Sequence, residues 1–233
     1  MATKYELPEE ANEELIKTLG KEVEMKTFKT NAPMELNSNG SREFVKFICV
    51  GDYTGGFRAK CMFINDYLQE KPLSKGCIYS PTIGADFALK IIEKWQRSKE
   101  HDPIDIKLQL WDIGECERFS QMTRVYFAHS DGALVFWGPD HPSSLGGVPK
   151  WLKNIKKVCP SVPCVLITDN TGKEPRQWIG PGKIFESELA LDQFCKEHGF
   201  VSHFEITSRD WESGEKSVFG QAVNCLLNAI FKM

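Results

Sequence analysis

The sequence predicts an α/β fold, a six-stranded and mostly parallel sheet with helices on both faces and one antiparallel hairpin at an edge. The chain has 233 residues, 41% hydrophobic and 26% charged, which is enough to bury a sizeable core in one domain. From Phe44 onward, apolar runs of strand length alternate with helical stretches, a pattern typical of parallel sheets covered by helices. Two of the runs, 86–95 and 104–112, are joined by a short polar turn and are expected to form the hairpin.

The expected elements follow one another along residues 44–233. Apolar runs predict strands at 44–50, 86–95, 104–112, 132–138, 163–168 and 201–206. Helical periodicity predicts helices at 58–69, 118–128, 145–158, 186–198 and 216–231. The stretch 169–182 is rich in Gly and Pro, and we expect a long irregular loop there, on the ligand-binding rim of the sheet.

Residues 1–43 form a separate block, expected to be an N-terminal extension with an amphipathic helix followed by a linker. Its apolar residues recur every four positions, at Ala11, Leu15, Leu19 and Val23. The turn-forming residues of 31–41 predict the linker. Two alternatives are open for the helix, which either docks on its own domain or binds a partner.

Composition excludes several classes of function. A net charge of −3 provides no basic field for nucleic acid, and no apolar run is long enough to span a bilayer. The N-terminus lacks the basic and apolar regions of a secretory signal. The eight cysteines are scattered without a C-x-x-C pair, which favours structural thiols in the cytoplasm over disulfides or a metal site.

The segment from Gly51 to Arg58 lies where the first strand passes into a helix, the usual place of a phosphate-binding loop. Gly51 and Gly56 have the spacing of such a loop, whose next two residues are normally Lys and then Ser or Thr. The lysine neutralises the outer phosphates and the hydroxyl ligates Mg²⁺. Here Phe57 and Arg58 occupy those positions, so the phosphate and metal chemistry of the loop is impaired.

Five downstream motifs resemble the Rab family of small GTPases in order and spacing. They are Pro81–Lys90, Leu108–Ile113, Glu117–Phe119, Met122–Tyr126 and Asp192–Phe200. The resemblance covers about 44–233 and is nearest to the branch that serves melanosomes and other lysosome-related organelles. It implies a Ras-like G domain in which GTP and Mg²⁺ order two switch segments that recruit effectors to vesicle membranes.

The resemblance also assigns roles around the terminal phosphate. Thr82 corresponds to the switch I threonine that helps hold Mg²⁺, and Asp112 to the acidic metal-site residue of switch II. Glu115 replaces the glycine whose N–H meets the terminal phosphate, and a carboxylate there repels it. Cys116 replaces the glutamine that positions the attacking water, so hydrolysis by the family's route is not expected.

The base-reading motif is altered as well. It falls on Asp169 to Gly172, where Gly172 replaces the aspartate that binds guanine. The last nucleotide motif, at Thr207, Ser208 and Arg209, is largely kept.

These substitutions predict a degenerate Rab domain, a pseudo-GTPase without a nucleotide cofactor. We expect Arg58 to fill the metal position and pair with Asp112 and Glu115, or else to point into solvent. One alternative is an unusual switch that binds GTP or GDP with Mg²⁺, with Arg58 or Lys60 compensating for the lost lysine. Another is a different ligand in the remodelled pocket.

The resemblance further implies a surface for trafficking effectors or regulators. Phe87, Trp111 and Tyr126 match the three aromatic positions that Rab proteins present to partners, and Ile83 lies in the same switch. The alternative is that the aromatics are ordinary core or half-buried residues. The chain ends without the terminal cysteines of Rab tails, and Cys225 is too far from the end for a C-a-a-X site. Any membrane association is therefore expected to be peripheral and through partners. The alternative is a prenylated tail beyond Met233.

Overall fold

The fold is described from a computed structural model of the whole chain. The structure describes residues 44–51, 60–68, 82, 84–114, 125–139, 141–171, 179–180, 183–207 and 214–231. These residues all belong to the second of two compact units, 37–233. The expectations for residues 1–43 lie outside the described residues and stay predictions.

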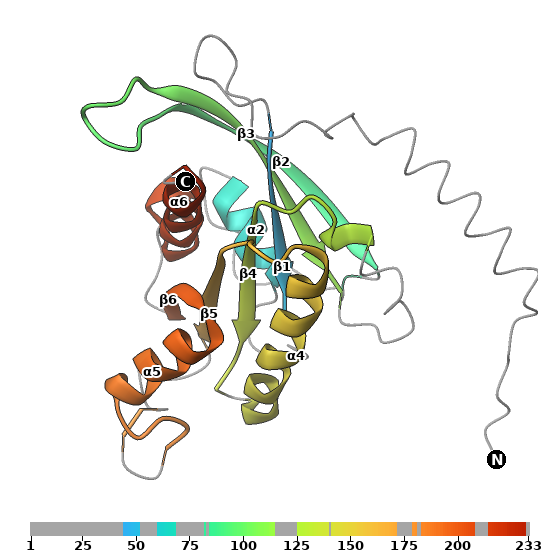
Figure 1. Cartoon of the computed structure of the whole chain (residues 1–233), viewed down its shortest axis with the longest axis vertical. Helices are drawn as coiled ribbons and strands as arrows, with labels where there is room; N and C mark the ends of the chain where they lie inside the picture. Colours follow the sequence, from blue (N-terminus) through green and yellow to red (C-terminus); the bar gives the residue numbers. More distant parts are fainter. Residues whose placement is uncertain are drawn as a thin grey trace, which may run out of the picture. The chain divides into compact units, whose positions relative to one another are not determined.

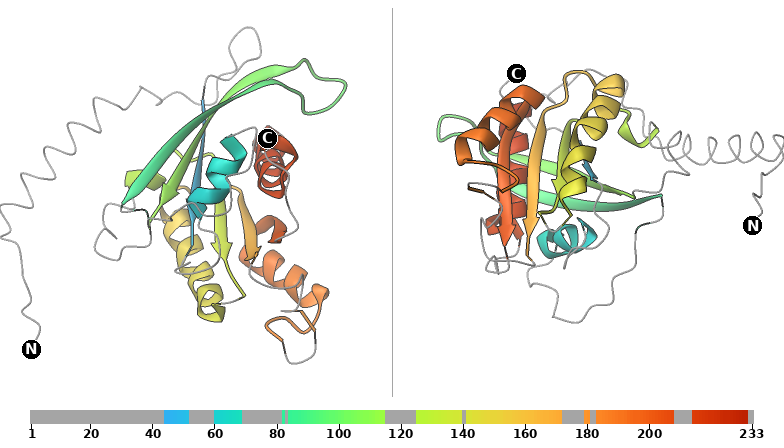
Figure 2. Two further views of the ribbon diagram at one scale, coloured as in Figure 1. Left: turned by 180° about the vertical axis from the view of Figure 1, so that it is seen from behind. Right: turned by 90° about the horizontal axis from the view of Figure 1, so that it is seen from below.

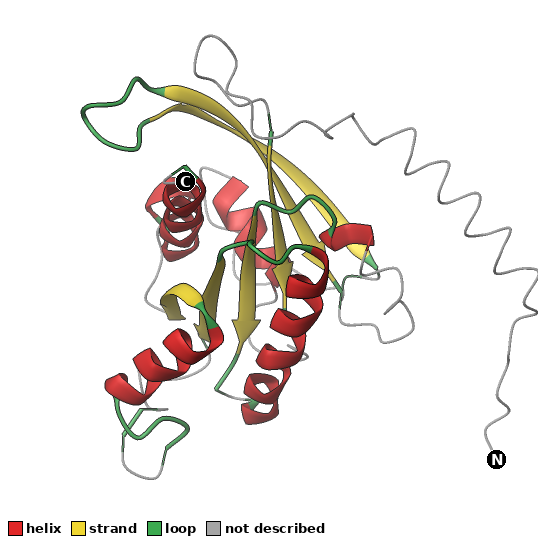
Figure 3. Cartoon of the chain, in the orientation of Figure 1, coloured by secondary structure: helices red, strands yellow, loops and turns green. Residues whose placement is uncertain are grey.

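The predicted sheet is confirmed, with six strands in the order β2-β3-β1-β4-β5-β6 (Figure 1). The strands are β1 (Val45–Val50), β2 (Ala85–Trp95), β3 (Ile104–Ile113), β4 (Gly132–Trp137), β5 (Cys164–Asn170) and β6 (Phe200–Thr207). Only the β2–β3 pair is antiparallel, while β1 pairs in parallel with both β3 and β4. Because β2 has one neighbour, the predicted hairpin forms an edge of the sheet (Figure 3).

Helices cover both faces of the sheet, as predicted. They are α2 (Lys60–Leu68), α4 (Pro142–Val158), α5 (Glu188–His198) and α6 (Val218–Ile230). Helices α2 and α6 pack on one face, and α4 and α5 pack on the other (Figure 2). Of the helix expected at 118–128, the stretch 118–124 lies outside the described residues, and 125–127 are helical.

Side-chain caps fix where α5 and α6 begin. Ser187 accepts a hydrogen bond from the backbone N–H of Ala190, and Ser217 accepts one from Gly220. Each hydroxyl satisfies one of the backbone donors left free in a first helical turn. Helix α5 then ends at Gly199, whose φ of 72° is the left-handed conformation that glycine adopts without strain.

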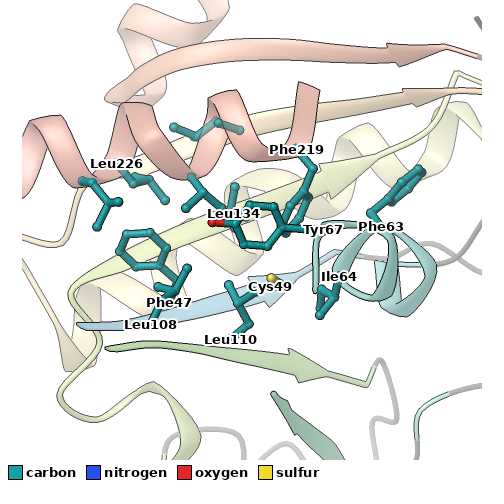
Figure 4. Close-up of a cluster of buried hydrophobic side chains, with 14 of the residues drawn as sticks. Phe47, Cys49, Phe63, Ile64, Tyr67, Leu108, Leu110, Leu134, Phe219 and Leu226 are labelled. Carbon is teal, nitrogen blue, oxygen red and sulfur yellow. The ribbon is translucent and has the colours of Figure 1, made fainter. Parts of the chain in front are cut away.

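The sheet separates two hydrophobic clusters because alternate strand residues point to opposite faces. In β1, Val45, Phe47 and Cys49 join the cluster under α2 and α6, whereas Ile48 and Val50 join the one under α4 and α5. Figure 4 shows the first cluster, where side chains of α2 and α6 meet those of the central strands. Burial of both faces of β1 positions its carboxyl end, where Gly51 lies.

The hairpin is attached at its far end to α6. The Trp95 indole N–H donates a 2.7 Å hydrogen bond to Asn224, and the Trp95 and Phe231 rings lie 5.1 Å apart. Arg97 donates a 2.8 Å hydrogen bond to the carbonyl of Phe231. The hairpin is therefore held between the sheet at one end and the last helix at the other.

Among the described residues, no helix is long and apolar enough to cross a membrane.

Replacing Leu226 by Ala is expected to lower the free energy of unfolding by roughly 2–5 kcal/mol, because it removes a fully buried side chain between α6 and the sheet. Urea denaturation of the purified protein measures the loss. The matched control is Gln221→Ala, an exposed position on the same helix, which should change stability by less than about 0.5 kcal/mol. Equal losses in the two variants would contradict this packing.

Candidate functional site

The candidate site lies at the carboxyl ends of β1 and β3, beside the start of α2. It begins at Gly51, whose φ is +151°, and a Cβ there would lie 2.3 Å from the carbonyl oxygen of Phe136. Only glycine allows this approach of the chain to β4. The structure thus brings Gly51, Thr82 and Asp112 to one place, as the resemblance implies.

Asp112 is the centre of the site and is only 5% exposed. Its Oδ2 accepts a 2.7 Å hydrogen bond from the hydroxyl of Thr82. Its Oδ1 lies 4.0 Å from the Nζ of Lys60, the first residue of α2. The same ammonium donates a 3.5 Å hydrogen bond to the carbonyl of Gly51. Lys60 therefore connects the end of β1 with the end of β3.

Burial controls the electrostatics of the site. Loss of hydration raises the pKa of the Asp112 carboxyl above its ordinary value. The positive charge of Lys60 and the hydrogen bond from Thr82 both oppose this rise in pKa, and the nearby charge of Asp86 adds to it. The two favourable partners therefore stabilise the ionised carboxylate in a buried position.

The backbone closes the site on its second side. The N–H of Gly114 donates a 2.7 Å hydrogen bond to the carbonyl of Gly84. A Cβ at Gly114 would lie 2.2 Å from the carbonyl oxygen of Thr82, so only a glycine allows the two segments to meet. Switch I at Thr82 and the end of β3 are therefore in direct contact.

The Mg²⁺ site that the resemblance implies is described at two of its residues. Mg²⁺ requires near-octahedral oxygen ligands at about 2.0–2.1 Å. Thr82 and Asp112, the two residues expected to flank the metal, bond directly to each other, and the cationic Lys60 lies alongside.

A small cavity lies next to Asp112, between α2 and the hairpin. Its volume is about 100 Å³, and its lining includes Cys61, Asp86 and Phe87. A drug-sized ligand generally needs a pocket of roughly 300 Å³ or more, so this space suits a few water molecules.

The three expected aromatic residues form a continuous surface, which we call the aromatic surface. Phe87 of β2 lies opposite Trp111 of β3, with ring centroids 5.2 Å apart, and Trp111 and Tyr126 are 5.9 Å apart. Phe87 is 48% exposed, while Trp111 and Tyr126 are half-buried. Two further apolar side chains of β2, Leu89 and Ile91, are 49% and 57% exposed, and sequence reasoning missed them. In the sequence, the signal for their exposure was their alternation along the strand with Ala88 and Ile92.

Lys46 of β1 supports the aromatic surface from the sheet, a role that sequence reasoning also missed. Its ammonium lies 4.8 Å from the centroid of the Trp111 ring and donates a 2.8 Å hydrogen bond to the carbonyl of Ala128. Burial lowers the pKa of Lys46 to about 8, and the electrostatic influence of Cys159 and Asp131 opposes this shift. A lone lysine inside an apolar strand was the signal for its unusual position.

The base-reading segment is described only up to Thr171. Asp169, at the end of β5, accepts hydrogen bonds from the backbone N–H of Thr171 at 3.0 Å and from its hydroxyl at 2.7 Å. One carboxylate oxygen of Asp169 is thus engaged by the chain itself. The other predicted site residues lie outside the described residues: Gly56, Phe57, Arg58, Ile83, Glu115, Cys116, Gly172 and Ser208.

Comparison with known proteins finds one matching family and several similar Rab proteins. The family described as "Ras of Complex, Roc, domain of DAPkinase" matches residues 46–172. Ras-related protein Rab-32 of Homo sapiens is 36% identical over 137 residues, which cover 57% of this chain and 55% of that protein. Ras-related protein Rab-7L1 of Rattus norvegicus is 30% identical over 177 residues, covering 73% of this chain and 77% of that protein. The chain thus spans about half the length of the Rab-32 relatives that it matches.

The lowered pKa of Lys46 predicts a specific pH dependence of stability. Between its pKa of about 8 in the folded protein and about 10.5 in the unfolded chain, the unfolded chain holds more protons at this position. The contribution of Lys46 to the free energy of unfolding should therefore rise between pH 8 and 10, by up to about 3 kcal/mol. Urea denaturation of the wild type and of Lys46→Met across this pH range measures both free energies of unfolding, and their difference gives the contribution of Lys46. The exposed Lys153→Met serves as the control, and a pH-independent difference for Lys46→Met would refute the shift.

Proposed function

The chain belongs to the Rab family of small GTPases, and from this premise we propose that it is a pseudo-GTPase acting as a protein-interaction module in vesicle and endolysosomal trafficking. The observation that carries the proposal is the aromatic surface of Phe87, Trp111 and Tyr126 at the edge of the sheet. Relatives named Rab-32 and Rab-7L1 support placing its partners among trafficking effectors and regulators.

The aromatic surface has the properties of a binding site. Three large apolar side chains occupy every second position along β2 and are each about half exposed: Phe87, Leu89 and Ile91. Exposed aromatic anchors of this kind carry much of the binding energy in protein interfaces. We therefore assign partner binding to this part of the switch region, with peripheral association of a cytoplasmic protein with membranes through its partners.

The loss of nucleotide chemistry is argued from the sequence. Phe57 and Arg58 remove the phosphate-binding lysine and the metal-binding hydroxyl, and Gly172 removes the main contact to guanine. Glu115 replaces the glycine that meets the terminal phosphate in Rab proteins, and repulsion between the two negative charges costs on the order of several kcal/mol in a partly desolvated site. Cys116 removes the group that orients water. Together these changes affect phosphate, metal, base and water separately.

One observation favours the second candidate, an unusual GTP-binding switch. The Nζ of Lys60 lies 3.5 Å from the carbonyl of Gly51, so a positive charge is present at the first residue of the phosphate loop. In this second function, Lys60 supplies the charge that the missing lysine no longer provides. Nucleotide content distinguishes the two functions.

The purified 233-residue protein should release far less than one guanine nucleotide per chain on acid denaturation, because the phosphate and base contacts are lost. Chromatography of the released nucleotide measures this, with an active small GTPase purified in parallel as the positive control. GTP with Mg²⁺ should also leave the thermal unfolding temperature unchanged. A ligand raises this temperature only when it binds the folded protein, and we expect no such binding. Stoichiometric nucleotide, or stabilisation by GTP, would favour the second candidate.

Phe87→Ala should weaken binding to a trafficking partner of the wild-type protein at least about tenfold, because truncating an anchor residue typically costs 2 kcal/mol or more. Calorimetric titration of the purified pair measures the dissociation constant. The matched control is Leu189→Ala, which removes a similarly large and exposed apolar side chain from α5. A partner whose affinity responds equally to both substitutions, or to neither, would contradict the assignment of the surface.

A further inference from the structure

We propose that Lys60 is an internal cation that holds Thr82 of switch I against Asp112, in the place where a nucleotide switch uses a bound metal ion. The inference rests on the proposed lack of nucleotide and concerns how Thr82 is held at the end of β3 without one. It assigns to Lys60 a structural role that the lost metal and phosphate contacts would otherwise perform.

The position of Lys60 supports this role. The residue is 7% exposed, and a buried ammonium is unfavourable unless a charged or polar partner compensates for lost hydration. Its Nζ has two such partners, the carboxylate of Asp112 at 4.0 Å and the carbonyl of Gly51 at 3.5 Å. Attraction between opposite charges is stronger in such a buried site than at the surface.

Asp112 transmits the effect of Lys60 to switch I. One carboxylate oxygen faces Lys60, and the other accepts the 2.7 Å hydrogen bond from Thr82. Because Lys60 faces one oxygen of Asp112 and Thr82 bonds to the other, Lys60 fixes the orientation of the carboxylate that holds Thr82.

The contact between Gly84 and Gly114 lies just before the aromatic surface in the chain. Two residues after Thr82, the carbonyl of Gly84 accepts the 2.7 Å hydrogen bond from Gly114, and β2 begins at the following residue, Ala85. Phe87 lies only three residues beyond this contact. Lys60 thus fixes the start of the strand that presents the partner-binding side chains, with no requirement for Mg²⁺.

Hydrogen exchange of the 233-residue protein tests the role of Lys60, with the Gly114 amide as the reporter because it donates a hydrogen bond to the carbonyl of Gly84. In Lys60→Met, exchange at Gly114 and across 84–88 should be faster by on the order of tenfold, since Asp112 loses its charged partner. Lys60→Arg keeps the positive charge and should exchange like wild type. Lys153→Met, which removes an exposed positive charge from α4, is the matched control.

Wild-type exchange should be the same in Mg²⁺ and in EDTA. The inference is overturned if Lys60→Met exchanges like wild type, or if EDTA alone opens the wild-type segment. If Lys60→Met does not fold, Lys60→Gln is compared with Lys60→Arg under the same criterion. Stoichiometric nucleotide in the wild-type protein would instead refute the proposed function, whereas unchanged exchange in a nucleotide-free Lys60→Met protein refutes the role of Lys60 alone.

Discussion

The buried carboxylate of Asp112 is the group on which the switch region depends. It receives the hydroxyl of Thr82 and faces the ammonium of Lys60, so it joins β3, α2 and switch I at one point. A charged group with 5% exposure is stable only when such partners replace its hydration. The two contacts are therefore interdependent, and the loss of one partner weakens the other.

The alternation of side chains along β3 links this site to the aromatic surface. Trp111 and Asp112 are consecutive, so their side chains point to opposite faces of the sheet. Trp111 contacts Phe87 and lies over Lys46, whereas Asp112 contacts Thr82. One strand thus carries both the buried polar contact and the exposed aromatic one, and a displacement of β3 would disturb both.

The hairpin is restrained at both of its ends. At one end Gly84 and Gly114 are joined by a backbone hydrogen bond, and at the other Trp95 contacts Asn224 of α6. In a Rab protein the corresponding segments change with the bound nucleotide. Attachment at both ends favours a fixed surface, which agrees with a module whose output does not depend on hydrolysis.

The sequence by itself determined the six strands, their mostly parallel arrangement and the edge hairpin, because hydrophobic periodicity and turn residues are local properties of the chain. Family motifs were sufficient to place Gly51, Thr82 and Asp112 at one site. Only the tertiary structure decided that Lys60 points toward Asp112 and that Lys46 lies beneath Trp111. The direction of a lysine side chain depends on charges and rings contributed by distant segments, and no local pattern in the sequence encodes where these meet.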